Sequence, residues 1–118
     1  MKKSAIDLDD VLERVQGDWD LLLELLDIFA QDYLVKRPLL DEFLSQSNFD
    51  KLRDIGHSLK GASGNISAKD LFASFLQIEK MAESKNLSRI GGILKDVDRQ
   101  FAELQECIAQ IKDDYKNR

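Results

Sequence analysis

The chain has 118 residues, and its reactive side chains are few: one histidine, His57, and one cysteine, Cys107. These two cannot supply the four protein ligands of a usual zinc site, and a lone cysteine cannot form an intrachain disulfide. We therefore predict no metal site. Cys107 lies beside the apolar positions of the last predicted helix, so packing is its expected role. His57 is left as the candidate for chemistry.

His57 is predicted to point away from the core. Successive residues of an α-helix are about 100° apart around the axis, and Ile66 marks the core side of this segment. Leu59 and Ile55 then fall within about 20° of that side, whereas His57 falls roughly 180° away. A lone histidine is more often a packed or surface residue without a reaction, but the neighbours of His57 argue against that reading.

Three of the six glycines lie close to His57 in the sequence: Gly56, Gly61 and Gly64. Each glycine inside a helix costs about 0.5–1 kcal/mol relative to alanine, so a compensating role is expected. Gly61 and Gly64 follow His57 by four and seven residues and share its face, which predicts clearance for another molecule. Gly56 lies nearer the core and is a candidate packing glycine. Gly64 could instead end the helix as a C-cap.

Two cations flank His57 on the same face, Arg53 four residues before it and Lys60 three after it. In a chain of net charge -5 they form a locally positive spot that suits a phosphoryl group. Arg53 could equally pair with Asp50 or Asp54 on its own helix. We therefore favour Lys60 as the phosphate contact and keep Arg53 as a weaker candidate.

The kind of reaction follows from the openness of this face. An accessible imidazole is a nucleophile near neutral pH and can accept a phosphoryl group without a dedicated base. A serine hydrolase would need a nucleophile and an acid enclosed with His57 in a pocket, which an open helix face does not offer. A di-metal bundle enzyme uses Glu-x-x-His pairs, but Asp54 stands three residues before His57. The pattern favours a covalent carrier that uses its partner's active site.

Composition narrows the setting. With 17 Lys and Arg against 22 Asp and Glu and a pI near 4.9, the chain is poorly suited to binding nucleic acid. No segment resembles an export signal or approaches the ~18–20 apolar residues of a membrane span. We expect a single cytoplasmic, monomeric domain over residues 1–118.

The elements that must position His57 are helices, because the chain has one proline and no run of alternating β-branched residues. We predict an all-α fold: an antiparallel up-down-up-down four-helix bundle with a short additional N-terminal helix. Gly17 should end the short helix, the third helix should run to about Gly64, and the last should begin near Ile90. The predicted N-caps are Asp7, Asp18, Asn48 and, with Asp70 three residues on, Ser67.

The second helix is apolar on two sides, and Pro38 predicts a kink or break in it near Lys36–Arg37. A helix apolar on two sides must be covered twice, either by the short N-terminal helix or by a partner protein. One stripe comprises Leu22, Leu26, Phe29 and Tyr33, and the other comprises Leu21, Leu25, Ile28 and Val35.

The string HSLKGASGNI at residues 57–66, followed by Ala68 and Leu71, resembles the signature of histidine-containing phosphotransfer (HPt) domains of two-component phosphorelays. The resemblance is specific because it combines a histidine, a lysine at three, a glycine at four and the apolar spacing. It also extends to the acidic first helix, the leucine-rich second helix and the long last helix. Ser67 departs from the pattern, since the family usually has glycine there, and we interpret it as a helix cap.

The resemblance implies a role for each matching residue. His57 would be phosphorylated, Lys60 would contact the phosphoryl group, and Gly61 and Gly64 would give clearance to a receiver domain. A polar side chain of the next helix hydrogen-bonds the histidine in many members, and Glu79 is a candidate. A glutamate there would repel phosphate, so its presence would need an explanation.

The implied mechanism is reversible transfer between His57 and a receiver aspartate, with the acidic pocket and Mg²⁺ supplied by the receiver. The chain would then be a carrier without cofactor, not an enzyme, and its partners would be receiver domains and a sensor or hybrid histidine kinase. Two alternatives stay open: a domain phosphorylated directly by a chemotaxis-type kinase, and a helical adaptor that is never modified. Candidate residues for docking the receiver, with core packing as the alternative, are Leu8, Val11 and Leu12.

Overall fold

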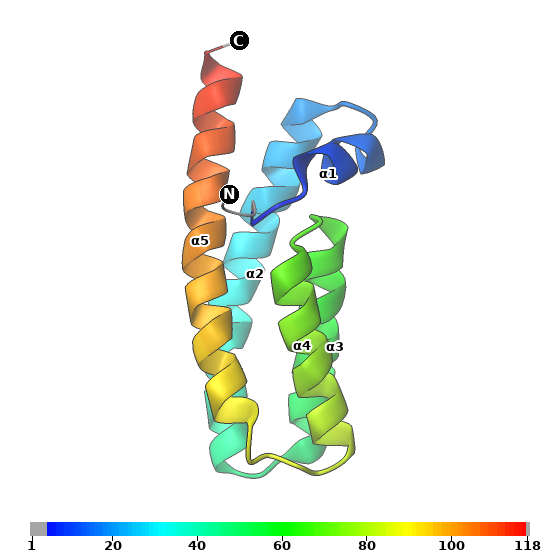
Figure 1. Cartoon of the computed structure of the whole chain (residues 1–118), viewed down its shortest axis with the longest axis vertical. Helices are drawn as coiled ribbons and strands as arrows, with labels where there is room; N and C mark the ends of the chain where they lie inside the picture. The colour runs from blue at the N-terminus through cyan, green and yellow to red at the C-terminus, as the bar shows by residue number, and fades with distance from the viewer. Residues whose placement is uncertain (1–4, 118) are drawn as a thin grey trace.

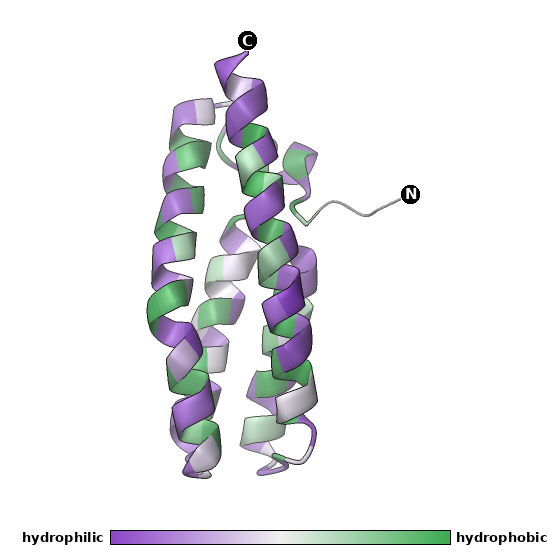
Figure 2. Cartoon of the chain, turned by 90° about the vertical axis from the view of Figure 1, so that its left-hand side faces the viewer, coloured by the Kyte–Doolittle hydropathy of each residue, from purple (hydrophilic) through white to green (hydrophobic). Residues whose placement is uncertain are grey.

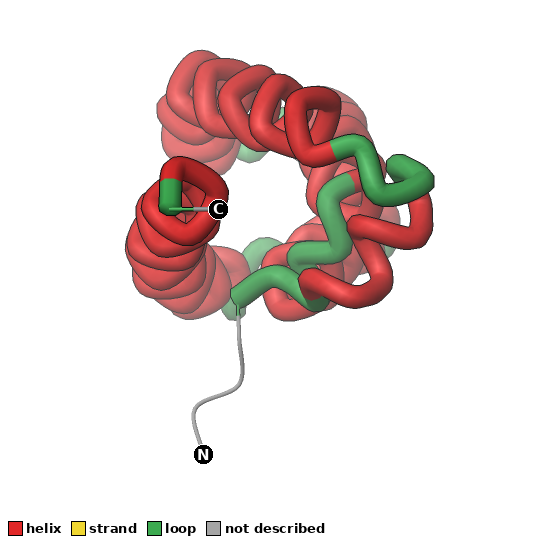
Figure 3. Tube along the Cα trace, turned by 90° about the horizontal axis from the view of Figure 1, so that it is seen from above, coloured by secondary structure: helices red, strands yellow, loops and turns green. Residues whose placement is uncertain are grey.

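The computed structural model describes residues 5–117, which form five helices and no strand. Four long helices lie side by side and alternate in direction, and the short first helix crosses one end of them (Figure 1). Viewed from above, the long helices surround a common centre (Figure 3). The predicted all-α bundle with a short N-terminal helix is confirmed. The helices are α1 (Leu8–Arg14), α2 (Trp19–Ser45), α3 (Phe49–Asn65), α4 (Lys69–Glu83) and α5 (Ile90–Lys116).

Three of the four predicted N-caps are confirmed. The side chains of Asp7, Asp18 and Asn48 each accept a hydrogen bond from a backbone N–H three residues further on, at 3.1, 3.0 and 3.2 Å. Each bond satisfies one of the N–H groups that the first turn of a helix leaves without a partner. These caps set where α1, α2 and α3 begin.

The capping role predicted for Ser67 is wrong. The N-cap of α4 is Ala68, which makes no side-chain cap bond, and Ser67 has a left-handed backbone with φ of 56°. That conformation suits glycine best, which explains the glycine in the motif that this segment resembles. Here the Ser67 hydroxyl donates to Asp10 at 2.6 Å, and its carbonyl accepts from the Asp7 N–H at 3.0 Å. Ser67 therefore holds α1 against the α3–α4 connection.

The break predicted near Lys36–Arg37 does not occur. Instead, α2 is one helix of 27 residues that includes Pro38. A proline inside a helix removes one backbone hydrogen bond and costs about 3 kcal/mol. Contacts with α5 beside the proline offset that cost. Arg37 Nε donates to Asp98 Oδ1 at 2.7 Å, and the Tyr33 ring stacks on Phe101 with centroids 3.7 Å apart.

The core follows the apolar period predicted from the sequence. Hydrophobic and hydrophilic residues alternate along each long helix (Figure 2), and the first stripe of α2 is buried. In α5 the apolar residues that recur at spacings of four and three are all buried. They are Ile90, Leu94, Val97, Phe101, Leu104, Ile108 and Ile111.

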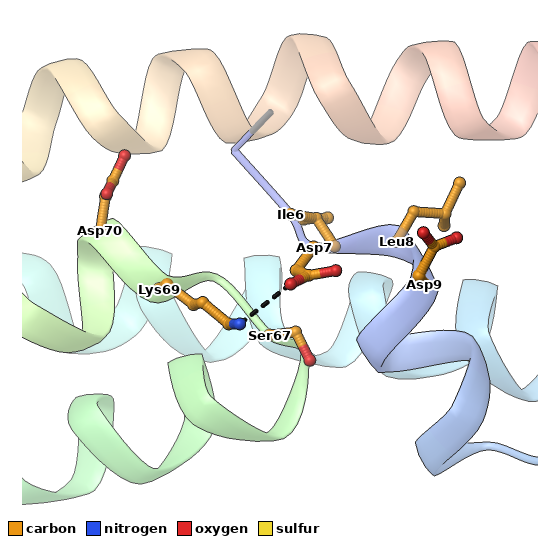
Figure 4. A pocket seen from close by; sticks show the side chains of 7 residues that line it. All are labelled: Ile6, Asp7, Leu8, Asp9, Ser67, Lys69 and Asp70. Atoms are coloured by element: carbon orange, nitrogen blue, oxygen red, sulfur yellow. Dashed lines mark hydrogen bonds and ion pairs between the residues drawn. The ribbon is translucent and has the colours of Figure 1, made fainter. Parts of the chain in front are cut away.

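The second stripe of α2 is exposed, contrary to the prediction that the short N-terminal helix covers it. Leu21, Ile28 and Val35 are 40%, 54% and 70% exposed, and Leu25 is half-buried. The seven residues of α1 lie over the connection between α3 and α4 instead of along α2 (Figure 1 and Figure 4). The alternative cover, a partner protein, remains open. No helix within residues 5–117 is long and apolar enough to cross a membrane.

Candidate functional site

His57 lies on the outward face of α3, as the helical period predicts. Its side chain is 67% exposed, whereas Leu52 and Leu59 on the opposite face are fully buried. The ring therefore stands on a convex helix surface and not in a cleft. This geometry leaves room for a large partner to reach the imidazole.

Glu79 of α4 joins the two functional candidates of α3. Its Oε2 lies 2.7 Å from His57 Nδ1, and its Oε1 accepts a hydrogen bond from Lys60 Nζ at 2.6 Å. The hydrogen bond from Lys60, more than that from His57, lowers the pKa of Glu79 against the raising effect of burial. Glu79 is therefore a carboxylate, and its side chain is only 11% exposed.

This contact determines which nitrogen of His57 carries the proton. A carboxylate can only accept hydrogen bonds, so Nδ1 of His57 must donate to Glu79. In the neutral ring the other nitrogen, Nε2, then keeps its lone pair. The site thus presents a nucleophilic nitrogen on an exposed side chain, with the ring orientation fixed from behind.

Gly56 is what lets α4 bring Glu79 this close. A Cβ at Gly56 would lie 3.4 Å from the backbone nitrogen of Glu79, 3.4 Å from Ile78 and 3.6 Å from the carbonyl oxygen of Phe75. The two helices therefore touch along their backbones at this level. The packing role predicted for Gly56 is confirmed, and it supports the His57–Glu79 hydrogen bond.

Gly61 and Gly64 differ, although the sequence predicts clearance at both. A Cβ at Gly61 would meet nothing within 4 Å, so the space beside it is open. A Cβ at Gly64 would lie 3.3 Å from the ring of Phe72, which already fills that space. Gly64 therefore seats an aromatic ring, and its role in clearance for a receiver stays a prediction. Gly64 is not a C-cap either, because α3 runs to Asn65.

Arg53, the weaker of the two candidate phosphate contacts, pairs with acidic residues of its own helix. Arg53 Nη2 lies 3.1 Å from Asp54 Oδ1, and its Nη1 lies 3.7 Å from Asp50 Oδ1. These exposed pairs are worth little in stability, but they direct the guanidinium to its own helix. Lys60 is the cation that the structure joins to the histidine through Glu79.

Of the three docking candidates on α1, Val11 is fully buried and belongs to the core. Leu8 and Leu12 are half-buried. The exposed stripe of α2 lies next to a contact with α3. Lys36, which follows Val35 of the stripe, donates to Ser58, the residue after His57, at 2.6 Å.

Sequence reasoning missed one exposed residue near the site, Phe72 of α4, and did not locate the stripe of α2. Two residues of the stripe, Leu25 and Ile28, line a pocket of about 190 Å³ between α2 and α3 together with Ala62. Phe72 lies outside the buried apolar positions of α4, among them Leu71 and Phe75, so a core-directed period does not single it out. A search of residues 5–117 for three or more His, Cys, Asp or Glu side chains able to hold a metal found none.

An antiparallel helical bundle that presents one oriented histidine on an open face has the construction of a covalent carrier domain. The Hpt domain family matches residues 24–114, which include most of α2 and all of α3 and α4. The chain belongs to the Hpt domain family, and its function is histidine phosphotransfer in a phosphorelay.

A solved structure supports the same assignment. The chain is similar to histidine-containing phosphotransfer protein B (HptB) from Pseudomonas aeruginosa PAO1, with 28% identity and a TM-score of 0.83. The similarity covers 92% of this chain and 95% of that one. A comparison with curated proteins found no match.

Proposed function

We propose that Nε2 of His57 takes a phosphoryl group from the aspartyl phosphate of one receiver domain and passes it to the aspartate of another. The observation that carries this is the His57–Glu79 hydrogen bond, which leaves Nε2 as the unprotonated nitrogen. The Nε2 lone pair forms the N–P bond while the aspartate P–O bond breaks and the carboxylate leaves. The reverse transfer returns the electron pair to Nε2. The proton on Nδ1 stays with the ring throughout.

The charges around the ring fit both states of the carrier. Phosphorylation at Nε2 leaves Nδ1 protonated and gives the ring positive character, which the carboxylate of Glu79 stabilises. Lys60, bound to the same carboxylate, offsets the repulsion between Glu79 and the phosphoryl group. We propose that Lys60 contacts the phosphoryl group directly. The charge of Lys60 thus explains how a glutamate, which would otherwise repel phosphate, can lie beside His57.

The partner would supply the rest of the chemistry. In-line phosphoryl transfer depends on positioning and on charge stabilisation, and within residues 5–117 no group of three or more His, Cys, Asp or Glu side chains is placed to hold a metal ion. We propose that the receiver provides the acidic residues and Mg²⁺, so that this chain is a carrier and binds no cofactor of its own. A sensor or hybrid histidine kinase would stand at the start of the relay. We further propose that the protein acts in the cytoplasm as a monomer.

The exposed stripe of α2 is the surface we propose for docking the receiver. Ile28 and Val35 are 54% and 70% exposed, and Ile28 lines a pocket together with Ala62 of α3, the residue after Gly61. Apolar residues exposed in a continuous line mark interaction sites more often than chance. Leu8 and Leu12 of α1 would extend this surface at its upper end.

The test is phosphoryl transfer from receivers charged with acetyl phosphate in the presence of Mg²⁺. We expect a label on the protein that is stable to alkali and lost in acid, and its complete loss in His57→Gln. Ser58→Ala is the matched control, because it removes the neighbouring hydroxyl and should keep the label. Circular dichroism should give the same helix content for all three proteins.

Other outcomes separate the alternatives. A label that appears only with a histidine kinase and ATP would support a chemotaxis-type kinase substrate instead of a carrier between receivers. Binding of a receiver that is unchanged in His57→Gln, without any label on the wild type, would support an unmodified adaptor. A label that survives acid would exclude phosphohistidine.

A further inference from the structure

Phe72 is an aromatic side chain at the surface of α4. It is 37% exposed, whereas Phe75 one turn later is fully buried. Within residues 5–117 the other large apolar side chains of comparable exposure are all on α2. Phe72 is thus the apolar surface residue on the α4 side of the histidine face.

The ring of Phe72 is held against α3. Two of its atoms lie 3.3 and 3.5 Å from where a Cβ of Gly64 would be, so the ring occupies the place of the missing side chain. A glycine within a helix costs about 0.5–1 kcal/mol, and here it lets an exposed aromatic lie close to the backbone. Because its ring is already packed on one side, Phe72 loses little conformational entropy on contact with a partner.

Phe72 also lies within reach of anything that reaches His57. Gly64 follows His57 by seven residues on the same face, which is about 10.5 Å along the axis. A partner interface of standard size buries about 800 Å² on each side, equivalent to a disc of roughly 16 Å radius. A receiver centred on His57 would therefore cover Gly64 and meet the ring on it.

We propose that Phe72 is a specificity-determining contact for the receiver domain, seated on Gly64 and facing an apolar side chain of the partner. This inference rests on the proposed function, since the receiver must dock over His57. The ring lies on the side of His57 opposite the exposed stripe of α2. The receiver would thus be contacted on both sides of the histidine. A receiver with a charged residue opposite Phe72 would be disfavoured.

The experiment is single-turnover transfer from a panel of phosphorylated receivers at increasing concentrations of this protein. For the receiver that the wild type prefers, Phe72→Ser should raise the concentration for half-maximal rate about tenfold, as expected for loss of an aromatic anchor. The maximal rate should stay within about twofold, because the chemistry at His57 is untouched. For a poorly preferred receiver the half-maximal concentration should change less than about twofold.

Two further variants complete the design. Gly64→Ala, whose Cβ displaces the ring without removing it, should shift the half-maximal concentration in the same direction by a smaller factor. The matched control is Leu34→Ser, which removes an apolar side chain of α2 that is 60% exposed and outside the stripe, and which should change nothing. Urea unfolding should verify that each variant is folded.

The inference fails if Phe72→Ser leaves the half-maximal concentration unchanged for every receiver. It also fails if all receivers weaken equally, which would mean that Phe72 contributes affinity without selection. A fall in maximal rate together with stability would assign Phe72 a structural role only. Absence of any label on the wild type would instead contradict the proposed function.

Discussion

Glycine occurs on both the inner and the outer face of α3, but it serves a different purpose on each face. On the inner face, Gly56 lets the backbone of α4 approach, and Leu59 is fully buried. On the outer face, Gly61 meets nothing within 4 Å, and His57 is 67% exposed. The contacts of Gly56 are explained within this chain, whereas the open space at Gly61 is explained only by another molecule. Comparing the faces separates what folds the protein from what makes it a carrier.

The largest effect that would test this separation is expected on the inner face. Leu59→Ala should lower the free energy of unfolding by about 2–5 kcal/mol, because the removed side chain leaves a cavity in a packed core. Urea denaturation measures this loss. Transfer to His57, expressed per folded molecule, should stay near the wild-type rate. Loss of transfer by a variant that remains fully folded would show that the two faces are coupled.

A smaller effect of opposite sign is expected on the outer face. Gly61→Ala should raise the free energy of unfolding by about 0.5–1 kcal/mol, since alanine favours the helix and its Cβ meets no atom. The same variant should slow transfer from a receiver, because the methyl group enters the clearance beside His57. Unfolding and transfer are measured on the same preparation. Faster or unchanged transfer would contradict the clearance role.

The smallest effect concerns Glu79, which links the two faces. The hydrogen bond from Lys60, the main cause, lowers the pKa of this carboxyl below its ordinary value of 4.5. Because the folded-state pKa is the lower one, the stabilisation is present above pH 4.5 and is lost as pH falls through the folded-state value. Glu79→Gln lacks this stabilisation, so its free energy of unfolding should lie below that of the wild type above about pH 4.5. The difference should shrink in acid.

The control for this pH dependence is His57→Gln. It keeps Lys60, the principal partner of Glu79, so most of the pH dependence should remain. Urea unfolding across a series of pH values compares the three proteins. A difference between wild type and Glu79→Gln that stays constant down to pH 3 would contradict the lowered pKa.

The apolar period of the sequence predicts features that depend on one helix, but it does not predict features that depend on how two helices pack. The outward direction of His57 followed from the apolar period of its own helix, and the caps at Asp7, Asp18 and Asn48 followed from local residue patterns. The position of Glu79 depends on the distance between α3 and α4, so spacing could only name it as a candidate.

Two departures from what the local pattern suggests have a common physical origin. Ser67 matches a capping pattern, but its backbone is left-handed because the chain must turn sharply between α3 and α4. Gly64 shares a face with Gly61, but a ring from α4 covers it. In both cases a neighbouring element, which the local sequence does not reveal, determines the role of the residue.

The connection between α3 and α4 also has a consequence for chain entropy. Only residues 66–68 separate the two helices, whereas the hydrogen bond between Tyr115 and Asp20 that joins α5 to α2 spans 95 residues. Closing a loop costs more entropy as the loop lengthens. The contact between His57 and Glu79 closes only 22 residues, as does the one between Lys36 and Ser58, so the site is built from local pairings and the entropic cost of closing the bundle falls on the two longest helices.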